Sequence, residues 1–126
     1  EKQLRAESLV AGKMKTEENG RISYAVVTQE ERDRAGLTSD DFETGIDILR
    51  SLRGVEISFI LKESDKEKGV YKVSLRSNAS DVAAVAAAFG GGGHIRAAGC
   101  TVRGETPEAA VSPVLSLAVK ALHETK

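Results

Sequence analysis

The strongest constraint on the fold is a pair of alternating segments in the middle of the chain. Residues 55–62 (VEISFILK) and 70–76 (VYKVSLR) alternate apolar with more polar side chains, which is typical of β-strands that have one buried face. The polar segment SDKEKG at 64–69 separates them and predicts a turn, so we expect an antiparallel hairpin. Strand alternation then places Arg76 on the face opposite Tyr71.

Other segments predict that this hairpin belongs to a larger sheet. Residues 21–29 (RISYAVVTQ) are rich in β-branched and aromatic side chains, and residues 100–103 also favour a strand. Helical periodicity and start signals predict helices at 1–16, 40–54, 80–89 and 106–122, with one helical turn within 30–37. This order predicts an α/β fold: a mixed central sheet with helices on its faces, including an antiparallel hairpin.

The first predicted helix, at 1–16, carries many charges and few apolar residues. We expect it to face solvent or to link two domains, and to end near Gly20. Its thin apolar stripe consists of Leu4, Ala11 and Met14.

Three residues bear on the limits of the later helices. Gly45 weakens the helix at 40–54, so part of that segment is expected to be a loop. Ser80 is the expected N-cap of the third helix. Pro113 interrupts the last helix, which either kinks there or restarts with Ser112 as its cap.

Length and net charge limit the number of domains and the ways in which the chain can bind an anion. A length of 126 residues predicts one domain, and 18 basic against 19 acidic residues give a net charge of −1. A chain without a positive field must hold any anion with a local cluster of basic or polar groups.

No apolar run is long enough for a membrane span and no signal peptide is recognisable. The single Cys100 is expected to be a small buried hydrophobe, and we predict a cytoplasmic protein without membrane partners.

A run of four glycines, Gly90–Gly93, leads directly into His94 and then Arg96. Ordering surplus glycines is costly, so either this loop stays mobile or something requires a backbone without side chains. Glycines before a short helix at 94–99 would aim backbone N–H groups and the helix dipole at an anion. The spacing fits neither a nucleotide P-loop nor a dinucleotide fingerprint.

The longer string GGGHIRAAG at 91–99 resembles the GGGHxxAAG signature of the DHH-associated domain, the C-terminal substrate-binding domain of DHH phosphoesterases. The segments at 73–77 (VSLRS) and 81–94 resemble the strand and helix that precede this signature. The similarity extends over about residues 20–105. Within the family it is greatest to oligoribonucleases that degrade nanoRNA and dephosphorylate pAp, and RecJ-like exonucleases are more distant.

The resemblance implies a role in substrate binding for several residues and a catalytic role for none. The glycines and His94 are implied to hold the terminal phosphate or nucleotide, with Arg76 as a second anion contact. Arg96 is implied to add a basic group, and Arg50 is a weaker candidate. The implied phosphate-binding set is therefore Arg50, Arg76, Gly91, Gly92, Gly93, His94 and Arg96.

The family's metal-binding Asp-His-His motif is missing from this chain, whose only histidines are His94 and His123. The resemblance therefore implies that two divalent metal ions, Mn²⁺, belong to an N-terminal DHH catalytic domain of the same protein. Residues 1–19 are then expected to be a linking helix and residues 20–126 the substrate-binding domain. The parent protein would be a hydrolase, a phosphoesterase or 3'–5' exoribonuclease acting on short RNA or nucleotides.

Two other functions remain compatible with the sequence. One is a tRNA-binding or oligomerisation module related to the C-terminal domain of alanyl-tRNA synthetase, although the glycine loop of that relative lacks the equivalent of His94. The other is a structural domain in which the glycines are only a connection. The chain has no Trp, three Phe and two Tyr, too few aromatic side chains for the stacking surface of proteins that bind long single strands.

Overall fold

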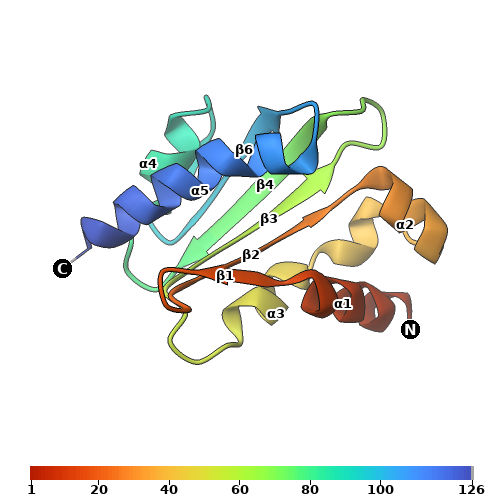
Figure 1. The fold of residues 1–126 in the computed structure, drawn as a ribbon, viewed down its shortest axis with the longest axis horizontal. Coiled ribbons are helices and arrows are strands. Elements are labelled where there is room, and N and C mark those ends of the chain that lie inside the picture. Colours follow the sequence, from red (N-terminus) through yellow and green to blue (C-terminus); the bar gives the residue numbers. More distant parts are fainter. Residues whose placement is uncertain (126) are drawn as a thin grey trace.

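A six-stranded mixed sheet forms the centre of the computed structural model, which describes residues 1–125 (Figure 1). Lys126, the last residue of the predicted domain, lies outside the described residues. The strand order is β1-β2-β3-β4-β6-β5; β2 and β3 are parallel, and every other neighbouring pair is antiparallel. The strands are β1 (Lys15–Glu17), β2 (Ile22–Val27), β3 (Ile57–Glu63), β4 (Val70–Ser77), β5 (Gly92–His94) and β6 (Ala97–Arg103).

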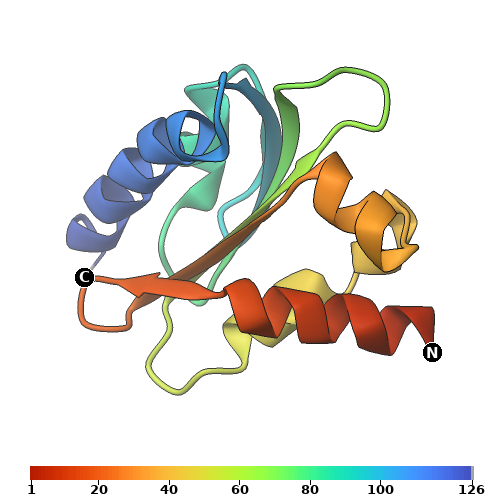
Figure 2. The same ribbon diagram turned by 45° about the vertical axis from the view of Figure 1, so that its right-hand side comes forward.

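Helices cover both faces of the sheet, which confirms the predicted fold class. On one face lie α1 (Lys2–Lys13) and α3 (Gly45–Arg50), with α2 (Gln29–Ala35) and the short 3-10 helix η1 (Ser39–Phe42) beside them. On the other face lie α4 (Val82–Ala87) and α5 (Pro107–His123). Figures 1 and 2 show the two layers of helices separated by the strands.

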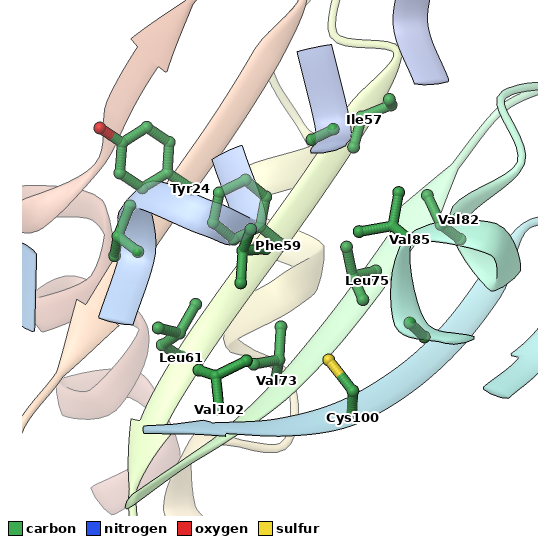
Figure 3. Packing of buried hydrophobic residues seen from close by; sticks show 14 of the residues in the cluster. Tyr24, Ile57, Phe59, Leu61, Val73, Leu75, Val82, Val85, Cys100 and Val102 are labelled. Atoms are coloured by element: carbon green, nitrogen blue, oxygen red, sulfur yellow. The ribbon is translucent and has the colours of Figure 1, made fainter. Parts of the chain in front are cut away.

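The larger core lies between the sheet and the pair α4 and α5, as Figure 3 shows. The predicted hairpin supplies its centre, because the odd-numbered residues of β3 and β4 point to this side. The rings of Tyr24 and Phe59 stack with centroids 5.0 Å apart. Cys100 is also buried here as predicted, and burial raises the pKa of its thiol.

A second core on the opposite face corrects the prediction for the N-terminal helix. Ala6 and Val10 of α1 are fully buried against Phe42 and Ile46, so this helix packs on the sheet. The expected stripe was wrong, since Leu4 is exposed. Small side chains make this contact, and they allow the helix to lie close to its neighbours.

The chain between α1 and β2 also differs from expectation. The helix ends at Lys13, well before Gly20, and β1 follows it as a short edge strand. Glu18, Asn19 and Gly20 have positive φ angles in the turn between β1 and β2. A strand of three exposed residues has no buried face, so its sequence carries no alternating pattern.

The other helix limits are settled by caps and by local packing. The predicted helix at 40–54 is divided into η1 and α3, with α3 beginning at Gly45. Asp81 caps α4, correcting the expectation of Ser80, because its side chain accepts a hydrogen bond from the N–H of Ala84 at 3.0 Å. The last helix is continuous through Pro113 and does not restart at that point.

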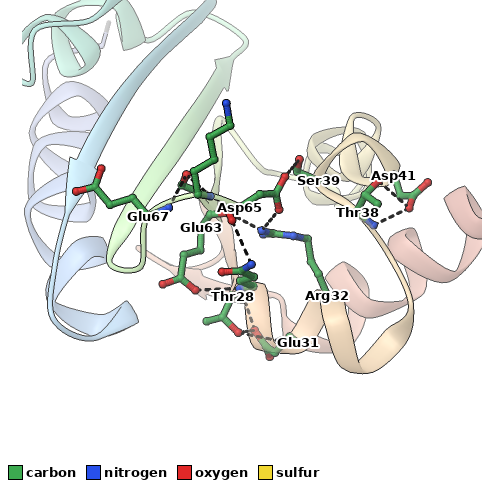
Figure 4. A network of polar contacts seen from close by, with 12 residues as sticks. Thr28, Glu31, Arg32, Thr38, Ser39, Asp41, Glu63, Asp65 and Glu67 are labelled. Carbon is green, nitrogen blue, oxygen red and sulfur yellow. Dashed lines mark hydrogen bonds and ion pairs between the residues drawn. The ribbon is translucent and has the colours of Figure 1, made fainter.

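A buried arginine ties α2 to the end of the β3–β4 hairpin (Figure 4). Arg32 is only 1% exposed, and its Nη2 donates to the carbonyl oxygen of Glu63 at 2.6 Å and to Asp65 at 2.7 Å. Ser39 donates to the other oxygen of Asp65. Within residues 1–125 the Nη1 of Arg32 has no hydrogen-bond partner, so the interaction rests on one nitrogen.

We predict that Arg32→Ala lowers the free energy of unfolding by about 2–3 kcal/mol, because it removes charge-assisted hydrogen bonds and buried packing together. Arg34→Ala is the control: its ion pair with Glu30 is exposed, and its loss is expected to cost less than about 0.5 kcal/mol. Urea unfolding monitored by circular dichroism measures both. Equal effects of the two substitutions would contradict the structural role of Arg32.

Candidate functional site

The glycine run ends α4 and then becomes the edge strand β5. Gly90 has a φ of +81° just after α4, and Gly92–His94 pair with Ala97–Gly99 of β6. The chain reverses at Ile95 and Arg96. The predicted short helix at 94–99 is therefore wrong, and no helix dipole acts at this loop.

Two of the glycines are required by the close approach of β6. A Cβ atom at Gly91 would lie 2.2 Å from the carbonyl oxygen of Gly99. At Gly93 it would lie 2.6 Å from the carbonyl oxygen of Ala97, and the φ of +144° is itself unfavourable for other residues. The bare backbone at these two positions thus serves the packing of the β5–β6 hairpin.

Gly92 differs from both of its neighbours. A Cβ atom there would meet nothing within 4 Å, and its φ lies outside the left-handed region. The fold therefore does not require glycine at this position. Of Gly91, Gly92 and Gly93, only Gly92 is left to be explained by the predicted space for a ligand.

The strand register places Arg76 and His94 in one row across the sheet. Both are on the same face, because Ala97 is the direct partner of each, through β4 and through β5. This is the face opposite Tyr71, as predicted for Arg76. Two strand spacings, about 10 Å, separate the two backbones, so side chains from both can reach a group lying over Ala97.

The neighbouring row offers almost no side chains. Ser74 is paired with Gly99, and Gly99 is paired with Gly92. A group lying over Ala97 between Arg76 and His94 therefore meets no side chain of Gly92 or Gly99 beside it. As β5 is the last strand of the sheet, its outer edge carries backbone groups that no neighbouring strand binds.

The remaining predicted site residues lie around this row. His94 and Arg96 are exposed and Arg76 is half-buried, with its Nη1 donating to the carbonyl oxygen of Leu75 at 2.9 Å. Arg96 lies in the turn of the β5–β6 hairpin, two residues after His94. Arg50 is exposed at the end of α3, on the same side of the sheet but outside the row.

A carboxylate that the sequence analysis missed fixes the loop beneath the hairpin. Glu56 accepts hydrogen bonds from the N–H groups of Ala79 and Ser80, both at 2.7 Å. The same loop holds the hairpin turn, because the N–H of Val82 donates to the carbonyl oxygen of Ile95 at 2.8 Å. Glu56 precedes a strand and belongs to no motif, so no sequence signal identifies it.

Burial and hydrogen bonding act in opposite directions on Glu56. Burial raises the pKa of its carboxyl, but the hydrogen bonds from Ser80 and Ala79 outweigh that effect and hold the pKa below its ordinary value of 4.5. The carboxylate form is therefore the one that stabilises the loop.

The family resemblance assigns its metal centre to an N-terminal catalytic domain and implies no metal ligand among the residues described here. In residues 1–125, no three side chains of His, Cys, Asp or Glu gather closely enough to hold a metal ion. His123 lies far along the chain from His94 and pairs with Glu18 at 2.6 Å. The same part of the chain contains no helix with the length and apolar character needed to cross a membrane.

The three glycines of the loop should respond differently to substitution. We expect Gly91→Ala and Gly93→Ala to destabilise the domain by more than about 3 kcal/mol, because the new methyl group would collide with backbone atoms. Gly92→Ala should change stability by less than about 0.5 kcal/mol. Thermal unfolding of the three variants checks this order, and a large loss at Gly92 would show that its glycine has a structural role.

Glu56→Gln tests the anchoring of the hairpin. Because the folded pKa lies below the unfolded one, the carboxylate contributes stability at neutral pH and this contribution is lost as pH falls from about 4.5 through the folded pKa. We expect the variant to be less stable than the native chain at neutral pH and the difference to shrink at about pH 3. Urea unfolding at the two pH values measures it; a difference independent of pH would contradict the assignment.

Comparison with known proteins matches this chain to a family. Residues 19–121 match the DHHA1 domain. An exopolyphosphatase-related protein from Bacteroides fragilis is similar in structure, with a TM-score of 0.78, 28% identity, and coverage of 98% of this chain and 35% of that one. The pGpG-specific phosphodiesterase PggH from Vibrio cholerae shares the fold, with a TM-score of 0.65, 16% identity, and coverage of 98% and 41%.

This chain thus spans between about a third and two-fifths of the length of these two proteins. The family match extends over most of the 126 residues and includes the row of Arg76 and His94 as well as the glycine run. The chain belongs to the DHHA1 domain family, the accessory domain of DHH-family phosphoesterases.

Proposed function

We propose that this domain holds the phosphate end of short oligoribonucleotides or of pAp, so that a DHH catalytic domain of the same protein can hydrolyse them. The observation that carries the proposal is the row in which Arg76 and His94 flank Ala97, next to the bare backbone of Gly92 and Gly99. It combines donors for an anion with space for it.

The chemistry of the row suits a phosphate group. A guanidinium donates two parallel hydrogen bonds to phosphate oxygens, and an imidazole donates one through a ring N–H. The exposed edge of β5 can add backbone N–H donors. Since the whole chain has a net charge of −1, attraction of the phosphate depends on this local cluster rather than on a general field.

Arg96 and Arg50 have secondary roles in this proposal. Arg96, in the hairpin turn, contributes a further positive charge beside His94. Arg50, at the end of α3, contributes through longer-range attraction, because it lies outside the cross-strand row. Gly92 leaves space for the phosphate beside the row of Arg76 and His94. Gly91 and Gly93 allow the close packing of the β5–β6 hairpin that carries this row.

The proposal for the intact protein extends beyond the chain described above. We propose an N-terminal catalytic domain that holds two divalent metal ions, Mn²⁺, and activates water, with residues 1–19 leading into the substrate-binding domain of residues 20–126. The similarity to an exopolyphosphatase-related protein supports phosphate chemistry. A cytoplasmic location is part of the same proposal.

Binding of pAp to this chain tests the proposal. We expect pAp to shift the amide NMR signals of Arg76 and of residues 90–96, and we expect His94→Ala and Arg76→Ala each to weaken binding about tenfold, because each removes a charge-assisted hydrogen bond. Both residues are at least partly exposed, so the variants should stay folded.

Lys120→Ala provides the matched control, since Lys120 is exposed on α5, on the opposite side of the sheet. Its affinity for pAp should equal that of the native chain. Shifts confined to another region, or unchanged affinity in the His94 variant, would contradict the proposed site.

A further inference from the structure

Two lysines lie opposite each other in the β3–β4 hairpin, on the side of the sheet away from the larger core. Lys62 of β3 is the direct register partner of Lys72 of β4, so the two side chains share one face. Both line a hollow of about 390 Å³ between this hairpin and the segment around η1. Like charges directly opposite each other in a sheet are destabilising, and the repulsion is smallest when one of the two amines is neutral.

Lys62 is the amine that the surroundings favour as the neutral one. It is half-buried, whereas Lys72 is exposed, and it takes part in none of the ion pairs within residues 1–125. Burial and then the charge of Lys72 hold the pKa of the Lys62 ammonium below its ordinary value of 10.5. The charge of Arg32 acts in the same direction, and Glu43 and Asp40 act against it without reversing it. Lys62 therefore has a larger neutral fraction at pH 7 than an exposed lysine has.

The carboxylates of the same hollow differ in how far they are already engaged. Glu63 accepts hydrogen bonds from two backbone N–H groups, at 2.9 and 2.8 Å, and Asp65 accepts from two side chains (Figure 4). Asp40 and Glu43 are exposed, and no ion pair of the described chain includes them. The hollow thus combines a weakly basic amine with two carboxylates that can carry protons, and its charges of both signs favour an uncharged ligand.

We propose that Lys62 is a nucleophilic amine that forms an imine with a small uncharged aldehyde entering this hollow. A lysine that is partly desolvated and next to another cation is activated for this reaction, because the neutral amine is the nucleophile. The inference goes beyond the proposed function and does not depend on the row of Arg76 and His94.

The reaction needs only proton transfers. The nitrogen lone pair of Lys62 bonds to the carbonyl carbon, and one N–H proton moves to the carbonyl oxygen, which gives a carbinolamine. The hydroxyl group of the carbinolamine then leaves as water and the second N–H proton is lost, which leaves the C=N bond. Asp40 and Glu43 line the hollow and can carry these protons. Carbon and nitrogen keep their oxidation states when water is counted, so no oxidant or reductant is required.

Reductive trapping with propionaldehyde tests this inference on the native chain. Sodium cyanoborohydride converts the imine into a stable alkylamine, and mass spectrometry of Glu-C peptides measures the modification of each lysine. At pH 7 we expect Lys62 to be modified about fivefold faster than Lys120, which is exposed on α5. The rate at Lys62 should also rise with pH at a lower pH than the rate at Lys120.

Two substitutions of Lys72 separate the effect of its charge from the shape of the hollow. In Lys72→Ala the Lys62 ammonium loses a neighbouring cation, so we expect the modification of Lys62 at pH 7 to slow about threefold. Lys72→Arg keeps the charge and should keep the native rate. Because Lys72 is exposed, both variants should stay folded, which circular dichroism checks.

Three outcomes would overturn the inference. They are modification of Lys62 no faster than that of Lys120, an unchanged rate in Lys72→Ala, and an equal loss of rate in Lys72→Ala and Lys72→Arg. None of these measurements involves pAp. Failure of the aldehyde reaction therefore leaves the proposed phosphate site standing, and failure of pAp to bind leaves this inference standing.

Discussion

The register between β4 and β6 is the constraint on which the candidate site depends. It is fixed by the buried face, where Val73 and Leu75 of β4 lie opposite Cys100 and Ala98 of β6. A shift of one residue would move these side chains into solvent. The same register sets which residues meet on the opposite face, so the apolar core determines that Arg76 and His94 share a row.

Two glycines of the run are required by the pairing of β5 with β6, and one is not. Gly91 and Gly93 let β5 approach β6 so closely that no side chain fits between them. Without that approach, His94 would not be held in register with Ala97. Gly92 has no comparable constraint, and the absence of a structural reason there is what makes a functional reason for it worth testing.

Much of the fold follows from local patterns in the sequence. Alternation defines β3 and β4 and places Arg76 on the correct face. The face to which a strand side chain points depends only on whether its position along the strand is odd or even. The edge strands β1 and β5 carry no such pattern, since each is short and exposed throughout. The pairing of His94 with Ala97 joins β5 and β6 across the two-residue turn Ile95-Arg96, and the glycines that precede this turn are also compatible with a loop before a helix.

The family resemblance predicted more of the candidate site than periodicity did. It named the glycines, His94 and Arg76, whereas the structure was needed to separate Gly92, where a Cβ atom would meet nothing within 4 Å, from Gly91 and Gly93, which pack against β6. Glu56 was found by neither, because its contacts with Ala79 and Ser80 join segments more than 20 residues apart. Long-range hydrogen bonds of this kind leave no spacing in the sequence to detect.

An uncovered sheet face and an exposed edge strand expose a protein to association with other strands. Here β5 is only three residues long, which leaves little edge for another strand to pair with. The sheet face that carries Arg76 also carries Lys72 and Arg103 beside the apolar Val70 and Ala97, and these like charges disfavour the stacking of two copies of the face. One of these charges, Arg76, is also the guanidinium proposed to hold a phosphate, so under that proposal the same side chain would serve both purposes.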